Sequence, residues 1–256
     1  MRLFCDHEIT PADLHGQRVT VMGLGLFGGG RGLTEFLCNA GARVTVTDLR
    51  DADTLSDSIE LLKHLPIQWE LGKHHERDFV AADRVFVNPA VPRDHQLLLA
   101  AVARGVPLDT EMNLFFRLCR GRICGITGSN GKTTTTTLTG AMFRNHFESA
   151  RLGGNLGRSL LTEVDAIGPD DWVILELSSF QLEDLSDISR RPDISLVTNL
   201  SPNHLNRHKT YRAYEAAAYS LCQREPESIY HNYQVLYPPK KCECCVCKRC
   251  LQSRSS

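Results

Sequence analysis

RICGITGSNGKTTTTTLTGAMF, residues 122–143, joins a short apolar run of strand type to a helical pattern through a glycine-rich turn. Such a turn directs several backbone N–H groups and the positive end of the helix dipole toward one point, which suits a phosphate group. The turn consists of Gly128, Ser129, Asn130, Gly131, Lys132, Thr133 and Thr134. We therefore expect a strand, a phosphate-binding loop and a helix in this order, the core of an α/β domain.

Lys132 and Thr133 supply the chemistry of this turn. A lysine ammonium here can reach β- and γ-phosphates, and the Thr133 hydroxyl can ligate Mg²⁺. The spacing departs from the Walker pattern, whose first glycine would fall on Ile126. The alternative is a polar turn before a threonine-rich helix. The joint occurrence of strand, Gly-Lys-Thr and helix favours a site for a nucleoside triphosphate.

GLGLFG, residues 23–28, is a second glycine-rich turn nearer the N-terminus. It follows a β-branched run over 18–22 and precedes helical periodicity over 30–40, and the next strand, 43–47, ends at Asp48. Glycines at this spacing, with an acidic residue about 20 positions later, match the dinucleotide fingerprint. The motif alone leaves three interpretations open: binding of NAD, binding of another nucleotide, or the tight turn of a doubly wound sheet.

The rest of the chain alternates between strand and helix patterns. Helices are expected over 54–64, 94–104 and 111–118, strands over 67–71, 84–87, 172–175 and 194–197, and a third glycine-rich turn over 153–157. This alternation predicts an α/β fold with parallel sheets covered by helices. We expect a Rossmann-like domain over 1–108, part of a P-loop domain over 109–218, and an unrelated, disordered tail over 219–256.

Glu176 and His204 each lie at or just past the carboxyl end of a predicted strand. Because these ends converge on one crevice in a parallel sheet, both side chains are expected near the phosphate loop. A carboxylate and an imidazole beside a nucleotide can hold Mg²⁺ or a bridging water. The alternative is a helix-capping glutamate and a surface histidine; the nearby phosphate loop favours the metal site.

The composition excludes several other classes of protein. The chain has 256 residues, a formal net charge of −1 and 42% hydrophobic residues, so bulk attraction to nucleic acid is not expected. No apolar run approaches the ~20 residues of a membrane span, and the first ten residues lack the apolar core of a secretory signal. We expect a cytoplasmic monomer.

Four segments together resemble a known family. GITGSNGKTTTTTL, GGNLG, VILELSSFQLE and VTNLSPNHLNRH, in this order and spacing, closely resemble the Mur ligases of peptidoglycan synthesis, and within them the branch that adds D-glutamate. GLGLFG, VTDLR and NPAVP resemble the UDP-binding N-terminal domain of that branch. The resemblance implies an ATP-dependent ligase that activates UDP-N-acetylmuramoyl-L-alanine as an acyl phosphate, which the amine of D-glutamate attacks. It also makes the glycine-rich turn over 23–28 a UDP site rather than a dinucleotide site.

The resemblance also assigns roles to individual residues. It implies that the uracil is contacted by Leu26, Phe27, Asp48 and Arg50. It implies that Asn88 and Asn155 lie at the UDP-sugar substrate. The ATP phosphates would be held by the turn from Gly128 to Thr134, with Lys132 neutralising charge. The resemblance implies that magnesium is surrounded by Thr133, Glu176 and His204.

The resemblance ends after Tyr214-Glu215-Ala216-Ala217. The family continues with a lysine that is carbamylated and bridges the metals, whereas Ala218 stands at this position here. We therefore expect one metal ligand fewer. We also expect the last part of the ATPase domain and the acceptor domain to be missing, and ligation to be very weak or absent.

KCECCVCKRC, residues 241–250, lies within the expected tail. Its thiolates could bind Zn²⁺, which would suit a non-catalytic nucleotide-binding module with a zinc-binding tail. The competing explanation is a change of reading frame near position 218, and the abrupt loss of similarity favours it. An NAD-dependent oxidoreductase is a third alternative, but it offers no role for Lys132.

Overall fold

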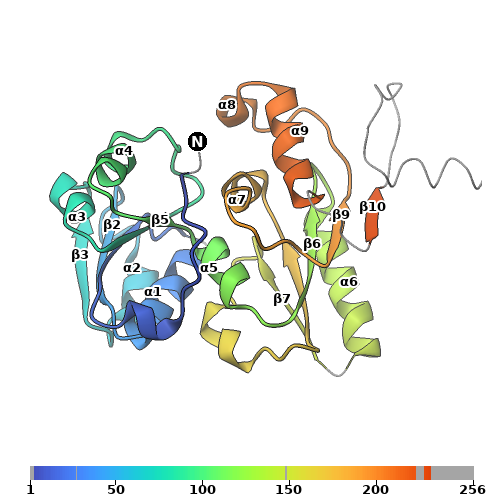
Figure 1. Ribbon diagram of the computed structural model, residues 1–256, viewed down its shortest axis with the longest axis horizontal. Coiled ribbons are helices and arrows are strands. Elements are labelled where there is room, and N and C mark those ends of the chain that lie inside the picture. Colours follow the sequence, from blue (N-terminus) through green and yellow to red (C-terminus); the bar gives the residue numbers. More distant parts are fainter. Residues whose placement is uncertain (1–2, 27, 148, 223–227, 232–256) are drawn as a thin grey trace, which may run out of the picture.

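The computed structural model describes residues 3–26, 28–147, 149–222 and 228–231, which form two parallel five-stranded sheets side by side (Figure 1). The first sheet has the order β3-β2-β1-β4-β5. Its strands are β1 (Arg18–Met22), β2 (Arg43–Asp48), β3 (Ile67–Leu71), β4 (Arg84–Val87) and β5 (Leu108–Asp109). The second sheet has the order β10-β9-β6-β8-β7. Its strands are β6 (Arg122–Thr127), β7 (Ala150–Gly154), β8 (Trp172–Glu176), β9 (Ile194–Val197) and β10 (Ser228–His231).

Helices cover both faces of the first sheet. Its helical segments are η1 (Pro11–Leu14), α1 (Gly29–Asn39), α2 (Ser56–Leu62), α3 (Glu76–Val80) and α4 (Gln96–Ala103). The side chains of Val19 and Val21 point to one face and pack in a cluster with Leu33 of α1. Met22 points to the opposite face and packs in a second cluster with Phe79 of α3. Side chains alternate between the faces of a strand, so a buried strand with two apolar faces needs a helical layer on each.

The second sheet is covered in the same way. Its helical segments are α6 (Lys132–His146), η2 (Leu161–Ala166), α7 (Ser179–Leu185), α8 (Leu205–His208), α9 (Tyr211–Tyr219) and η3 (Ser220–Cys222). Cys124 and Ile126 lie in a cluster with Phe143 of α6 on one face. On the opposite face, a Cβ on Gly125 would lie 3.0 Å from Leu221, so the absence of a side chain lets the segment after α9 pack directly on β6.

The first strand of each domain lies in the middle of its sheet. Strand β1 lies between β2 and β4, and β6 lies between β8 and β9. The chain leaves each central strand toward one side of its sheet and later crosses to the other side. At such a change of direction, a crevice opens at the carboxyl ends of the strands. Two of the three glycine-rich turns singled out in the sequence, over 23–28 and 128–134, follow these central strands.

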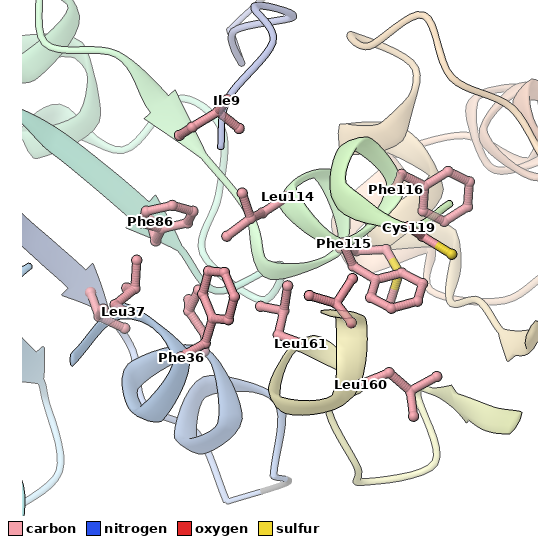
Figure 2. Packing of buried hydrophobic residues seen from close by; sticks show 14 of the residues in the cluster. Ile9, Phe36, Leu37, Phe86, Leu114, Phe115, Phe116, Cys119, Leu160 and Leu161 are labelled. Carbon is pink, nitrogen blue, oxygen red and sulfur yellow. The ribbon is translucent and has the colours of Figure 1, made fainter. Parts of the chain in front are cut away.

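Helix α5 (Glu111–Leu118) joins the two sheets, and Figure 1 shows it between them. One hydrophobic cluster runs continuously from the first sheet through α5 into the second domain. Figure 2 shows its members, among them Phe36, Phe86, Leu114, Phe115 and Leu161. The two sheets thus share a core, and their relative position is set by close packing of apolar side chains.

Most expected elements are present, with differences at short segments. The strands over 67–71, 84–87 and 194–197 and the helix over 111–118 have the expected bounds. Residues 76–80 form α3 and 205–208 form α8, two helices that periodicity did not predict because each is shorter than two turns. The glycine-rich stretch expected as a turn over 153–157 begins inside β7, since Gly153 and Gly154 pair with β8.

The range expected as a tail contains ordered structure at its start. Residues 220–222 form η3, in which Leu221 is buried, and residues 228–231 form β10, which pairs in parallel with β9. The ordered second sheet therefore extends beyond position 218. The cysteine run over 241–250 lies outside the described residues.

Candidate functional site

The phosphate loop lies between β6 and α6, at the switch point of the second sheet. Gly131 immediately precedes α6 in the left-handed conformation, with φ of 76°. Gly128 has φ of 140°, and a Cβ there would lie 2.1 Å from Thr198 Oγ1. Glycine is therefore required at Gly128 by both conformation and space. The loop leaves the first backbone N–H groups of a 15-residue helix directed toward the crevice.

The segment after β9 holds this loop in place. The Asn130 backbone N–H donates to Asn199 Oδ1 at 3.1 Å, and Asn199 Nδ2 donates to the Asn130 carbonyl at 2.8 Å. The Ser129 N–H donates to the Asn199 carbonyl at 2.9 Å. The Ser129 hydroxyl lies 2.8 Å from the buried hydroxyl of Tyr214 in α9. Neither Asn199 nor Tyr214 was predicted as a site residue, although Asn199 stands at the carboxyl end of a strand, where ligand-binding loops occur.

Lys132 lies over the loop that it follows. Its Nζ donates to the carbonyl oxygens of Gly128 at 2.7 Å and Ser129 at 3.2 Å. The ammonium group is therefore held within the turn, next to the helix N-terminus. Two positive features, the ammonium and the helix dipole, face the same point, which is an arrangement suited to an anionic ligand.

Glu176 connects the phosphate loop to the glycine-rich turn after β7. Its carboxylate accepts from Thr133 Oγ1 at 2.7 Å and from Asn155 Nδ2 at 3.0 Å. Asn155 also donates its backbone N–H to the Glu176 carbonyl at 2.8 Å. Glu176 is only 2% exposed, so these contacts fix its orientation at the end of β8. Gly154, with φ of 84°, permits the approach, because a Cβ there would lie 2.2 Å from the Glu176 carbonyl oxygen.

His204 lies at the same edge of the sheet, but it contacts a different group. It precedes α8 with φ of 51°, and its ring centroid is 5.0 Å from that of Phe180 in α7. Helix α7 begins three residues after Glu176, so the imidazole is positioned beside the segment that carries the carboxylate. Within the described part of the chain, no hydrogen bond links the His204 ring to Glu176 or Thr133. Ala218 is buried in α9 and supplies no ligand.

A second set of polar groups surrounds the turn after β1. The buried Asp48 carboxylate accepts from the Gly25 N–H at 3.3 Å and from the Arg50 N–H at 2.9 Å. The Arg50 guanidinium lies 3.3 Å from the same carboxylate. Asn88 Nδ2 donates to the Gly23 carbonyl at 3.2 Å. Asp48, Arg50 and Asn88, three of the residues predicted to contact the UDP-sugar substrate, are thus brought together at the carboxyl ends of β2 and β4.

Leu26 and Phe27, the other two residues predicted to contact the uracil, are less informative. Leu26 is 56% exposed beside this turn, which leaves an apolar side chain available to a planar ring. Phe27 lies outside the described residues. The exposure of Leu26 is consistent with a contact surface, but no described contact assigns it a partner.

The glycine-rich turn over 23–28 meets the one over 153–157 between the two sheets. A Cβ on Gly28 would lie 2.2 Å from the carbonyl oxygen of Gly157, and a Cβ on Gly32 would lie 2.4 Å from the Cβ of Ser159. Helix α1 therefore approaches the turn after β7 at backbone contact distance. This contact places the group around Asp48 and the group around Glu176 on facing edges of the two domains.

Two features are absent from the described residues: a metal-binding cluster and a membrane-spanning helix. Among them, no three His, Cys, Asp or Glu side chains cluster closely enough to form a metal-binding group. Metal binding near Glu176 would therefore involve the Thr133 hydroxyl and groups from a ligand as well. None of the helices in the described ranges combines the length and apolar character that crossing a membrane requires.

The sequence matches two family models that cover most of the chain. Residues 17–109 match the Mur ligase MurD-like N-terminal domain, and residues 126–235 match the Mur ligase middle domain. The second match includes β10 and extends past the position where the resemblance was expected to end.

Similar curated proteins share these domains. The chain is 48% identical over 201 residues to UDP-N-acetylmuramoylalanine--D-glutamate ligase of Roseiflexus sp. (strain RS-1), covering 78% of this chain and 43% of that protein. It is 40% identical over 195 residues to the ligase of the same name from Alkaliphilus oremlandii, covering 75% of this chain and 42% of that protein. The chain thus spans less than half the length of these relatives.

Two solved structures share the fold. The UDP-N-acetylmuramate:L-alanyl-gamma-D-glutamyl-meso-diaminopimelate ligase (MPL) from Neisseria meningitides has a TM-score of 0.58 at 19% identity, covering 86% of this chain and 72% of that one. The UDP-N-acetylmuramate-alanine ligase MurC from Thermotoga maritima has a TM-score of 0.54 at 21% identity, covering 84% of this chain and 49% of that one. At this level of identity the likeness establishes the arrangement of the two sheets.

Proposed function

Because this chain belongs to the Mur ligase family, with its N-terminal and middle domains, we propose that it binds UDP-N-acetylmuramoyl-L-alanine and ATP as part of a D-glutamate ligase. The observation that supports this most directly is the contact of Glu176 with both Thr133 and Asn155. That contact joins the phosphate loop to the turn that faces the first domain. The UDP group lies at the Asp48 turn and the triphosphate at the N-terminus of α6.

The proposed reaction has two steps. An oxygen of the substrate carboxylate attacks the γ-phosphorus of ATP, and the bond to the β-phosphate oxygen breaks, so that ADP leaves and an acyl phosphate forms. The amine of D-glutamate then attacks the acyl carbon, phosphate leaves with the electron pair of the C–O bond, and the nitrogen loses a proton to solvent to give the amide. The first step brings a carboxylate to a triphosphate, so the site must offset like-charge repulsion and align the reacting atoms.

The residues of this chain fit that requirement. Lys132 and the α6 N-terminus provide positive charge at the phosphates, and the loop contacts from Asn199 keep their donors oriented. Thr133 and Glu176 present hard oxygen donors 2.7 Å apart, which is the ligand type that Mg²⁺ prefers. We propose that these two residues hold a magnesium ion with the phosphates and that His204, just before α8, supports it. Bound magnesium would neutralise charge that develops on the transferred phosphoryl group.

The test separates binding from turnover, because the chain spans less than half the length of its relatives. Isothermal titration calorimetry measures binding of UDP-N-acetylmuramoyl-L-alanine and, separately, of a non-hydrolysable ATP analogue with MgCl₂. Lys132→Ala is expected to weaken binding of the nucleotide by about tenfold or more and to leave the UDP ligand unaffected, since it removes a charge-assisted contact. Asp48→Asn is expected to weaken binding of the UDP ligand and to leave binding of the nucleotide unaffected.

Lys63→Ala is the matched control, since Lys63 is an exposed lysine paired with Glu60, which is also exposed. Failure of the unaltered chain to bind either ligand would refute the proposal, as would equal nucleotide affinity in Lys132→Ala and Lys63→Ala. A phosphate-release assay with ATP, the UDP substrate and D-glutamate then measures the complete reaction.

A further inference from the structure

Two arginines connect the loop after β4 to the helices of the second domain. Arg93 ends the segment that begins at Asn88, the residue placed at the UDP-sugar site, and Arg207 lies in α8, which begins just after His204. Their partners lie mainly on α7, which begins just after Glu176. Each arginine therefore lies within six residues of a group proposed to meet a substrate.

Arg93 crosses the boundary from the first domain. Its Nη1 donates to the Glu183 carbonyl at 2.8 Å and lies 3.4 Å from Asp184 Oδ1. Its Nη2 donates to Asp187 Oδ2 at 2.5 Å. Asp187 also accepts from the backbone N–H groups of Leu3 and Phe4, at 2.8 and 3.1 Å. One guanidinium thus binds the end of α7 and the segment after it through three separate oxygen atoms.

Arg207 crosses the same boundary in the opposite direction. Its Nη1 donates to the carbonyl oxygen of Ala90 at 3.1 Å, within the loop between Asn88 and Arg93. Its Nη2 lies 3.8 Å from Glu183 Oε2, and its guanidinium lies over the Phe180 ring at 5.1 Å from the centroid. Phe180 is also the ring that packs against His204. Arg207 thus contacts both the loop of the first domain and the ring that positions the imidazole.

The groups that form these contacts are partly or fully buried. The side chains of Arg93 and Asp184 are 22% and 3% exposed, and those of Arg207 and Glu183 are 15% and 35% exposed, so solvent screens these contacts only in part. Burial raises the pKa of Asp184 to about 8, with Arg93 opposing the shift. The planar Arg93 guanidinium reaches oxygen atoms of three residues, Glu183, Asp184 and Asp187, a geometry that a lysine ammonium would not reproduce. A displacement of the loop over 88–93 must therefore be transmitted to α7 or break these contacts.

We propose that Arg93 and Arg207 are positioning residues that couple the occupancy of the UDP-sugar site to that of the nucleotide site. This inference rests on the proposed function, since it assumes that the loop at Asn88 and the phosphate loop each bind a ligand. Coupling of this kind requires that a ligand alter an element that contacts the other site. The two arginines provide that connection through α7 and α8, which adjoin Glu176 and His204.

The experiment measures the affinity of each ligand in the absence and presence of the other. Calorimetry with UDP-N-acetylmuramoyl-L-alanine is performed with and without a saturating non-hydrolysable ATP analogue and MgCl₂. For the unaltered chain the ratio of the two affinities is expected to be about fivefold or more, the usual range for linked sites. In Arg93→Gln and Arg207→Gln the ratio is expected to fall toward 1, while each ligand alone binds within about threefold of its original affinity.

Arg104→Gln is the control, because Arg104 is exposed at the end of α4. Arg93→Lys is expected to restore part of the ratio that Arg93→Gln loses, since lysine keeps the positive charge but lacks the planar set of guanidinium donors. A merely structural role would change both single-ligand affinities and leave their ratio unchanged. That result would overturn the inference, as would a ratio of 1 in the unaltered chain that binds both ligands.

Hydrogen exchange provides a second measurement that needs no variant. Binding of the UDP ligand alone is expected to slow amide exchange in residues 180–187, since the loop over 88–93 is fastened to them. Unchanged exchange there, with ligand bound, would overturn the inference. If the unaltered chain binds neither ligand, the proposed function is refuted and this coupling with it.

Discussion

Glu111 shows how one side chain acquires unusual chemistry from its neighbours. It begins α5 between the two domains, and its carboxyl accepts from Ser159 Oγ at 2.6 Å. Burial raises the pKa of this carboxyl from 4.5 to about 7, and the Ser159 hydrogen bond opposes the shift. The folded protein therefore keeps a proton that the unfolded chain releases at lower pH.

This shift predicts a specific pH dependence of stability. Because the pKa of Glu111 is higher in the folded state, its contribution is complete below about pH 4.5 and is lost as pH rises through about 7. Glu111→Gln keeps an acceptor for Ser159 without the charge. It is expected to increase the free energy of unfolding at pH 8 by about 1–3 kcal/mol and to change it little at pH 5.

Urea denaturation at the two pH values measures this effect. Glu8→Gln, at an exposed glutamate, serves as the control. An equal effect of Glu111→Gln at pH 5 and pH 8 would show that Glu111 does not titrate in this window.

At the scale of elements, the phosphate loop is held by two segments that follow it in the sequence. The segment after β9 supplies Asn199, and α9 supplies Tyr214, which is 2% exposed. Burial also raises the pKa of the Tyr214 hydroxyl, which remains protonated and bonded to Ser129. A loop in which donors are fixed before the ligand arrives loses less entropy on binding.

Tyr214→Phe tests this arrangement directly. Loss of the hydrogen bond to Ser129 is expected to lower the free energy of unfolding by about 1 kcal/mol. It is also expected to weaken binding of the ATP analogue by about three- to tenfold, because the loop must be ordered on binding. Calorimetry and amide exchange over residues 128–131 measure the two effects.

Tyr211→Phe is the matched control on the same helix, since Tyr211 is 36% exposed and its hydroxyl lies 3.5 Å from the Leu200 carbonyl. If the two variants bind the nucleotide analogue equally, Tyr214 does not order the loop.

At the scale of the whole molecule, the two sheets share one apolar core. Leu114 of α5 is fully buried at the boundary between them, and the same cluster contains Phe36 of the first domain and Leu161 of the second (Figure 2). The charged contacts of Arg93 and Arg207 lie at the edge of this interface. Packing therefore determines how the two domains are placed, and the ionic contacts refine the position of the loop and helices beside the site.

This shared core predicts cooperative unfolding. Leu114→Ala is expected to lower the free energy of unfolding by about 2–5 kcal/mol through lost transfer energy and a cavity. Differential scanning calorimetry should show a single transition that moves as a whole. Leu99→Ala, at an exposed leucine, should leave the transition nearly unchanged. Two separate transitions, of which Leu114→Ala moves only one, would contradict a shared core.

Much of this architecture follows from local pattern. The alternation of strands and helices and the two glycine-rich turns after β1 and β6 depend on periodicity and on glycine conformation, which act over a few residues. The same local signals placed Lys132 and Thr133 at the start of the helix after the phosphate loop and Glu176 at the carboxyl end of a strand. Short helices such as α8 were missed because their positions depend on packing, and periodicity needs more than one turn to be visible.

The sequence by itself determined the α/β class, the phosphate loop and the polar residues at the strand ends. Only the tertiary structure decided which of those residues touch: Glu176 binds Thr133 and Asn155, Asn199 and Tyr214 hold the loop, and His204 packs against Phe180. It also decided that Arg93 and Arg207 cross between the domains. The reason is physical: propensity and periodicity act along the chain, whereas contacts between distant segments depend on how the shared core packs.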